Sequence, residues 1–332
     1  MTRKNQKLTK LNRYSPIGTL GAMLESCRPA DSLAVEYFIE DWLLPLGGYS
    51  DAAGNVIVRV GDSSRVMWSS HTDTVHNKAG RQRVVISGDS FKLGHGSDSS
   101  CLGADCTTGI WLMREMILAG VHGLYVFHDS EETGGHGSAW LAKNTPQLLK
   151  GIDFCIAFDR KGFDSVITHQ IGGRTASDSF VASIVPQLPH KYQADQGGTF
   201  TDSANYVDLI GECSNLSVGY LAQHSKGETQ SVSHALAMRE SMLKFDESKL
   251  VASRKAGEVD SDYWEMSGYN YWRKDSGLVP IGKGSNSFYD LTRFVENHPH
   301  EVAAFLDDMG VTVGDLWDSY ESGFNSYGKG RV

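Results

Sequence analysis

Two adjacent carboxylates, Glu131 and Glu132, stand between a short apolar run and a glycine-rich turn in residues 125–138, which read YVFHDSEETGGHGS. Neighbouring carboxylates repel each other at neutral pH unless a positive charge lies between them. The pair at the end of a predicted strand therefore indicates a cation site, in which one glutamate binds a metal and the other moves protons. Taken alone, a Glu-Glu pair is more often a solvated acidic loop. The hypothesis thus depends on ligand-type residues elsewhere in the chain.

Four such residues lie at the ends of other predicted elements: His71, Asp105, Asp159 and His224. In an open α/β sheet, binding sites form outside the carboxyl ends of the strands, so we expect these side chains to meet the glutamates at one rim. Zinc takes histidine nitrogen and carboxylate oxygen as ligands, and a pair of zinc ions needs a ligand that spans both. Asp105, on a glycine-containing turn with two oxygens to share, suits that bridge.

The periodicity of apolar residues predicts the elements that position these side chains. Helical spacing covers residues 16–27, 32–45, 108–118, 138–143, 178–185, 202–210 and 231–245. Short apolar runs predict strands at 55–60, 66–69, 123–127, 154–158, 166–169 and 216–220, with a hairpin within 83–93. Strands that alternate with helices predict an α/β fold, a three-layer sandwich with a mainly parallel, twisted sheet and helices on both faces.

Composition predicts two regions of unequal size. Residues 1–247 form the domain that carries the site, and residues 248–332 form an irregular segment followed by a small helical extension. The polar and aromatic stretch at 260–275 lacks apolar periodicity, whereas 288–295 and 299–309 again have helical spacing.

Charge and cysteine content exclude several classes of protein. The formal net charge of -9 and the pI near 5.7 argue against a nucleic-acid binder. No apolar segment follows the basic N-terminal residues and no run reaches the length of a membrane span, so neither export nor membrane insertion is expected. Five scattered cysteines without CxxC spacing predict reduced thiols in a cytoplasmic protein. The sequence does not predict an oligomer.

Taken in order, the motifs resemble those of the co-catalytic di-zinc aminopeptidases and carboxypeptidases of the zinc-exopeptidase superfamily. The likeness covers about residues 65–245, and each motif is weak alone whereas the ordered set is a strong signal. The matching segments are His71-Thr-Asp73, Gly103-Ala-Asp105, Glu131-Glu132-Thr-Gly134-Gly-His-Gly137-Ser138, Asp159 and His224-Ser225, with Thr201-Asp202-Ser203 through Asn215-Leu-Ser-Val-Gly219-Tyr220 on the approach to His224.

The resemblance implies a set of ligands for two zinc ions. The first ion would be bound by His71, Asp105 and Asp159. The second would be bound by Asp105, Glu132 and His224. Cobalt or manganese would fit the same mixed ligands.

The resemblance also implies roles for residues that do not bind metal. Glu131 would be the general base, and Asp73 would orient His71 by accepting its second ring N–H. Cys106 departs from the family, because many relatives have another acid or Asn there. Since thiolate is a softer ligand, Cys106 could alter the choice of metal.

The segment from Asp159 to His224 is too short for the separate dimerisation domain that carboxypeptidase-like relatives insert at this point. The compact aminopeptidase branch, which hydrolyses an N-terminal peptide bond, is therefore predicted. One alternative is an amidase or deacylase that acts on N-acyl amino acids or another non-peptide amide. Another is an inactive, metal-free binding module, which is disfavoured because all five ligands and the base are present.

Overall fold

The computed structural model describes residues 15–189, 191–258, 295, 299–308 and 311–314. The chain divides into two units, Met1–Val259 and Asp260–Val332. Every residue of the candidate site belongs to the first unit. In the second, α10 (Pro299–Asp308) corresponds to the helix predicted at 299–309. The irregular stretch at 260–275 and all but residue 295 of the helix predicted at 288–295 lie outside the described residues.

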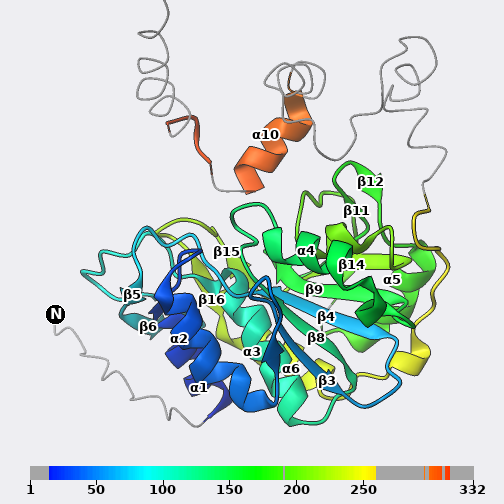
Figure 1. The fold of residues 1–332 in the computed structure, drawn as a ribbon. Coiled ribbons are helices and arrows are strands. Elements are labelled where there is room, and N and C mark those ends of the chain that lie inside the picture. The colour runs from blue at the N-terminus through cyan, green and yellow to red at the C-terminus, as the bar shows by residue number, and fades with distance from the viewer. Residues whose placement is uncertain (1–14, 190, 259–294, 296–298, 309–310, 315–332) are drawn as a thin grey trace, which may run out of the picture. The chain divides into compact units, whose positions relative to one another are not determined.

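An eight-stranded mixed sheet in the order β13-β10-β14-β9-β4-β8-β3-β2 forms the centre of the first unit (Figure 1). Its middle strands β14, β9, β4 and β8 are mutually parallel, whereas β3 and β2 are antiparallel to their neighbours and β10 is antiparallel to β14. The strands are β2 (Tyr49–Ser50), β3 (Val56–Val60), β4 (Val66–His71), β8 (Gly123–His128), β9 (Phe154–Arg160), β10 (Ser165–Ile167), β13 (Gln193–Asp195) and β14 (Glu212–Ser217).

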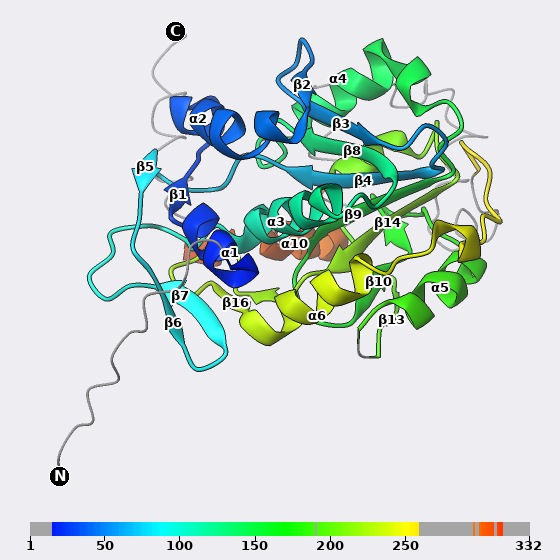
Figure 2. The same cartoon turned by 90° about the horizontal axis from the view of Figure 1, so that it is seen from below.

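Helices cover both faces of this sheet, which confirms the predicted α/β class. In Figure 2, α1, α3 and α6 lie over one face, where α3 contacts both of the others. On the other face, α4, η2 and η4 pack against a separate apolar cluster. The helices are α1 (Pro16–Leu24), α2 (Leu33–Trp42), α3 (Ala104–Leu118), α4 (His136–Asn144), α5 (Asp178–Ile184) and α6 (Val232–Met242), with short 3-10 helices η1 (Leu44–Leu46), η2 (Pro146–Leu149), η3 (Val185–Gln187), η4 (Asp202–Tyr206) and η5 (Glu247–Lys249).

Successive residues of the middle strands divide between the two cores. In β4, Trp68 belongs to the α3 side and Met67 to the α4 side; in β8, Tyr125 and Val126 divide in the same way. Both positions of each pair are apolar because a strand that is buried on both faces has no solvent side. Trp68 stacks on Phe158 of the next strand, with ring centroids 5.5 Å apart.

Helix α3 lies unusually close to the sheet because Gly109 has no side chain. A Cβ atom at this position would lie 2.2 Å from the carbonyl oxygen of Phe158 and 2.4 Å from Ser70 Oγ. The close approach brings the first turn of α3, with Asp105, to the carboxyl ends of β4 and β9.

Two predicted elements differ in the structure. The strand expected at 216–220 is β14 at Glu212–Ser217, and the helix expected at 202–210 is the short 3-10 helix η4. The start of β14 was missed because its residues Glu212, Ser214 and Asn215 are polar, which is unusual for a buried strand. These side chains bond internal groups instead of facing solvent: Ser214 donates to Ile167 O and Asn215 donates to Asp159 O.

The hairpin predicted within 83–93 is the β6-β7 pair, which belongs to a four-stranded sheet of order β15-β16-β7-β6. The other two strands of this sheet and the pairs β1-β5 and β11-β12 were not predicted. The bounds are β1 (Ser26–Cys27), β5 (Gly80–Arg81), β6 (Val84–Ser87), β7 (Ser90–Leu93), β11 (His169–Gln170), β12 (Gly173–Arg174), β15 (Tyr220–Leu221) and β16 (Thr229–Ser231). His224 therefore follows β15 of the small sheet and not a strand of the large one.

The five cysteines are all buried and free. None of the helices in the described part of the chain has the length and apolar character of a membrane span.

Candidate metal centre

Three parallel strands bring ligand-type side chains to one edge of the large sheet. His71 is the last residue of β4 and pairs in register with His128, the last residue of β8. Glu131 follows His128 by one short turn, and Asp159 lies near the end of β9. The polypeptide leaves all three strands on the same side, as the sequence predicted from the parallel arrangement.

Asp105 divides its carboxylate between two histidines. Its Oδ1 lies 3.1 Å from His71 Nε2, and its Oδ2 lies 3.2 Å from His224 Nε2. One carboxylate thus faces two imidazoles that come from different sheets. This is the arrangement of a ligand shared by two cations.

Each histidine faces a second carboxylate. Asp159 Oδ1 lies 3.3 Å from His71 Nε2, and Glu132 Oε1 lies 3.2 Å from His224 Nε2. Both oxygens are buried, and neither accepts a hydrogen bond from the part of the chain that the structure describes. A buried polar atom without a partner is costly, and a cation between these groups would satisfy it. The structure therefore brings the five predicted ligands together as two halves that share Asp105.

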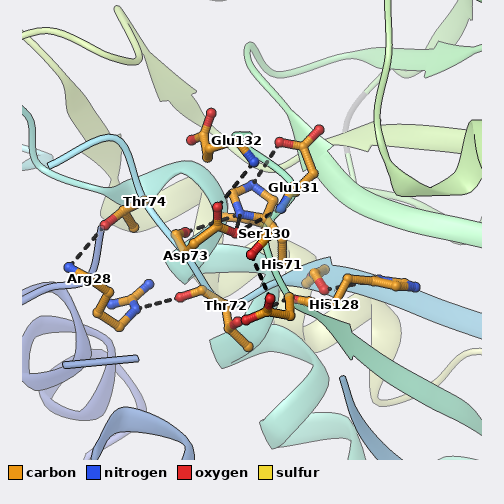
Figure 3. A network of polar contacts seen from close by, with 12 residues as sticks. Arg28, His71, Thr72, Asp73, Thr74, His128, Ser130, Glu131 and Glu132 are labelled. Carbon is orange, nitrogen blue, oxygen red and sulfur yellow. Dashed lines mark hydrogen bonds and ion pairs between the residues drawn. The ribbon is translucent and has the colours of Figure 1, made fainter. Parts of the chain in front are cut away.

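Asp73 connects the His71 strand to the Glu-Glu loop (Figure 3). Its two carboxylate oxygens accept the backbone N–H groups of Glu131 and Glu132, each over 3.1 Å. The Nδ1 atom of His71 lies 3.1 Å from the Asp73 carbonyl oxygen and 3.3 Å from its Oδ1. Because both neighbours are acceptors, we assign the proton of neutral His71 to Nδ1. The lone pair of Nε2 then points toward Asp105 and Asp159.

Asp159 is hydrogen-bonded by two residues, Thr201 and Asn215, that were not among the predicted site residues. Thr201 Oγ1 donates to Asp159 Oδ2 over 2.7 Å, and the Asn215 side chain bonds both the N–H and the carbonyl of Asp159. Thr201 and Asn215 both lie in the segment on the approach to His224 that carries part of the resemblance, but no role was predicted for either side chain.

Arg28 is a second unpredicted member of the network. It is fully buried, donates from Nε to Thr72 O and from Nη2 to Thr107 Oγ1, each over 2.8 Å, and lies over the Phe38 ring. It thereby joins the end of β4 to the first turn of α3. Figure 3 shows the bond from Arg28 to Thr72. Burial lowers the pKa of Arg28 to about 10, with Asp73 opposing the shift, so the guanidinium remains charged at neutral pH.

Acids outnumber bases in this cluster. Seven buried carboxylates face three imidazoles and one guanidinium, which leaves an excess of three acids even if every imidazole were protonated. The acids are Asp73, Asp105, Glu131, Glu132, Asp159, Asp202 and Glu228, and the bases are His71, His128, His224 and Arg28. A buried negative excess of this kind requires protons or cations for balance.

The pKa values of His224, Asp159 and Glu131 are all raised, so bound protons would offset part of this negative charge. Burial opposes protonation of His224, but the Asp105 and Glu132 carboxylates raise its pKa to about 12. Burial and the charge of Asp105 raise the pKa of Asp159 to about 7. Burial likewise raises the pKa of Glu131 well above its ordinary value, with His71 opposing and Asp159 adding to the shift. Divalent cations would take the place of these protons, so the donor set and its charge fit a pair of such ions.

Two other groupings share these atoms. Cys106 with His71 and Asp159, and Glu131 with His71 and Glu132, each offer ligand atoms within 4.8 Å of one another. The Cys106 thiol, however, donates to Phe158 O over 3.1 Å, and burial raises its pKa well above the ordinary value. An influence of Cys106 on the choice of metal stays a prediction.

No family model matches the sequence, and no curated protein matches it significantly. Solved structures do match. Aminopeptidase PepT from Bacillus cereus ATCC 10987 superimposes with a TM-score of 0.56 at 12% identity, covering 73% of this chain and 100% of its own. A tripeptidase from Staphylococcus aureus gives a TM-score of 0.55 at 12% identity, covering 73% and 99%. The Pyrococcus horikoshii TET1 peptidase, described as assembling into a tetrahedron or an octahedral shell, gives 0.52 at 15% identity, covering 70% and 100%.

The chain therefore shares the α/β fold of these peptidase structures, which agrees with the fold that its motifs predicted. At these levels of identity the likeness concerns the fold alone.

Proposed function

We propose that the protein is a metal-dependent hydrolase of amide bonds, most specifically an aminopeptidase that uses two zinc ions. The observation that carries the proposal is the division of the Asp105 carboxylate between His71 and His224. His71, Asp105 and Asp159 would hold one ion, and Asp105, Glu132 and His224 the other. When bound, such a pair lowers the pKa of a water molecule and polarises the scissile carbonyl group.

The proposed base is Glu131. Its Oε2 lies 4.0 Å from His71 Nε2, so it borders the first set of ligands, and the Glu131 side chain is 9% exposed. A carboxylate at this position can take a proton from an attacking water and return it to the leaving amine. Asp73 holds the backbone of both glutamates, so it fixes the distance between base and ligands.

Charge favours cleavage at the amino end of a peptide. With neutral histidines as ligands, Arg28 and two divalent ions carry five positive charges against the seven carboxylates of the cluster. With all seven carboxylates ionised, the remaining negative charge would attract the ammonium group of a peptide N-terminus and repel a C-terminal carboxylate. Two of the similar structures are described as an aminopeptidase and a tripeptidase, which supports this substrate class.

The test combines metal analysis with a substrate panel. Chelator-treated protein should regain activity on aminoacyl anilides when two equivalents of zinc are restored. Activity on N-acyl amino acids without activity on free-amine substrates would instead select the amidase or deacylase alternative. A carefully purified sample that binds no divalent metal would contradict the proposal and favour an inactive binding module.

A further inference from the structure

A buried carboxylate that none of the motifs includes lies directly behind Asp105. Glu228 is 1% exposed, and its side chain accepts four consecutive backbone N–H groups. Oε2 accepts those of Leu102 and Gly103, each over 2.8 Å, and Oε1 accepts those of Ala104 over 2.8 Å and Asp105 over 3.1 Å. Hydrogen bonds from N–H groups to an ionised carboxylate are among the stronger ones in proteins.

The backbone that donates these bonds is shaped to surround an anion. Gly103 has φ 70°, and a Cβ atom here would lie 2.7 Å from His76 Cε1, so only glycine fits this turn. Consecutive amides that converge at the start of a helix form a concave, positively polarised surface. In this chain the Glu228 carboxylate occupies that surface, so the conformation of the turn depends on that side chain.

Glu228 belongs to the same turn as the ligand His224. The two residues are separated by Ser225, Lys226 and Gly227, and the Glu228 N–H closes the turn by donating to Ser225 O over 3.1 Å. His224 Nε2 faces the Asp105 carboxylate at 3.2 Å, while Glu228 Oε1 binds the Asp105 amide. One turn thus holds Asp105 at both its side chain and its backbone.

We propose that Glu228 is a positioning residue that keeps the bridging carboxylate of Asp105 in register with His224, and so sets the affinity of both metal sites together. The inference rests on the proposed function, because it takes Asp105 to be a ligand of both ions. Glu228 itself would touch neither substrate nor metal.

The chain contains a matched control in Glu212. This residue is also fully buried, and its carboxylate accepts the N–H groups of Ser177, Ser253 and Arg254 and the Ser177 hydroxyl, over 2.7 to 3.0 Å. Glu212 begins β14 and pairs with Phe154 at the start of β9, so it lies at the end of the sheet opposite to Asp159. It therefore has the same hydrogen-bonding chemistry without a connection to the ligands.

The experiment measures zinc affinity by chelator competition in wild type, Glu228→Gln, Glu228→Asp and Glu212→Gln. Gln keeps the reach of Glu but presents an amide N–H₂ to two of the four donors. We expect Glu228→Gln to weaken both zinc sites in parallel by about 10- to 100-fold, the range found for residues that orient metal ligands. Excess zinc should restore kcat with KM unchanged. Glu228→Asp, which keeps the charge on a shorter side chain, should be intermediate, and Glu212→Gln should bind zinc as wild type does.

The outcomes separate this inference from the proposed function. If wild type binds two ions and Glu228→Gln binds both with unchanged affinity, the positioning role is wrong and the proposed function stands. If wild type binds no metal, both are wrong. If both Glu228 variants unfold under conditions in which Glu212→Gln stays folded, by circular dichroism, Glu228 maintains the fold and the positioning role is rejected.

Discussion

The carboxylate of Asp73 accepts the backbone N–H of Glu131 over 3.1 Å and so fixes the proposed base relative to the strand that ends in His71. The second oxygen does the same for Glu132, so a single side chain sets the position of the whole Glu-Glu pair. Asp73 is two residues from the proposed ligand His71, and its carbonyl oxygen and Oδ1 lie beside His71 Nδ1. Its role in the site is therefore indirect, through the groups that it holds.

Substitution Asp73→Asn should lower kcat/KM by about 10- to 100-fold, because the amide N–H₂ would face one of the two backbone donors. Zinc affinity should fall with it, as His71 loses an acceptor beside Nδ1. Asp246→Asn is the control, since Asp246 also accepts a backbone N–H, from Ser248, but its side chain is exposed and caps η5. Wild-type kinetics in Asp73→Asn would show that the loop is held by other contacts.

Substitution Glu131→Gln should remove the base and leave the ligands in place. We expect kcat to fall by about 10²- to 10⁴-fold, the usual contribution of general acid–base catalysis. The zinc content, measured by atomic emission, should stay at two per chain. Activity near that of wild type would exclude Glu131 as the base. Loss of one zinc would instead make it a ligand, and the order of roles within the Glu-Glu pair would have to be reversed.

The shared carboxylate predicts different metal stoichiometries for two variants. Asp105→Asn should lose both ions, because each half of the site depends on one oxygen of Asp105. His224→Ala should lose only the ion that Glu132 and His224 hold, and retain one at His71 and Asp159. Metal analysis after dialysis against dilute zinc distinguishes these cases. Equal stoichiometry in the two variants would contradict a bridging role.

The close approach of α3 to the sheet predicts a destabilising effect of Gly109→Ala. The added methyl group would meet Phe158 O and Ser70 Oγ at less than contact distance, so the helix must move outward. Overpacking of this kind costs about 1 to 3 kcal/mol, and urea denaturation would measure it. Leu118→Ala on the same helix is the control, because Leu118 is 61% exposed and its loss should change stability by at most about 0.5 kcal/mol. Equal stability of the two variants would show that the helix has room to move.

The buried His76 predicts that the folded protein loses stability in acid, because its side chain is only 4% exposed and its imidazole is neutral in the folded state. Its Nε2 lies 3.2 Å from Gln82 Oε1 and its Nδ1 lies 2.7 Å from Thr74 Oγ1. Burial, together with the charge of Arg28, lowers the pKa of His76 from 6.5 to about 4. Between these values the unfolded chain binds the proton and the folded chain does not, so stability falls as the pH decreases from 6.5 to 4.

This difference in pKa corresponds to about 3 kcal/mol of unfolding free energy over the window. His76→Gln keeps a donor for Gln82 but does not titrate, so its stability should decrease less between pH 6.5 and 4. Urea denaturation of both proteins in the same metal state gives the comparison. If the unfolding free energies of both proteins fall equally with decreasing pH, His76 is not responsible for the loss of stability.

Local sequence was sufficient for the fold class and for the prediction that the candidate ligands lie close together. Apolar periodicity is a property of neighbouring residues, so β4, β8 and β9 were predicted close to their observed bounds, and the parallel arrangement placed His71, Glu131 and Asp159 at one edge. Asp105 and His224 were proposed from their positions at the ends of predicted elements, and the order of the motifs supported that proposal. These inferences needed no knowledge of distant contacts.

Tertiary structure decided the features that depend on buried polar groups. Strand β14 was misplaced because Glu212, Ser214 and Asn215 look solvent-facing in sequence, yet each is buried against a distant backbone group. The position of Glu228 behind Asp105 was equally hidden, since its four donors lie more than 120 residues away along the chain. A buried carboxylate is tolerated only where its hydrogen-bond partners converge on it, and that convergence exists only once the chain has folded.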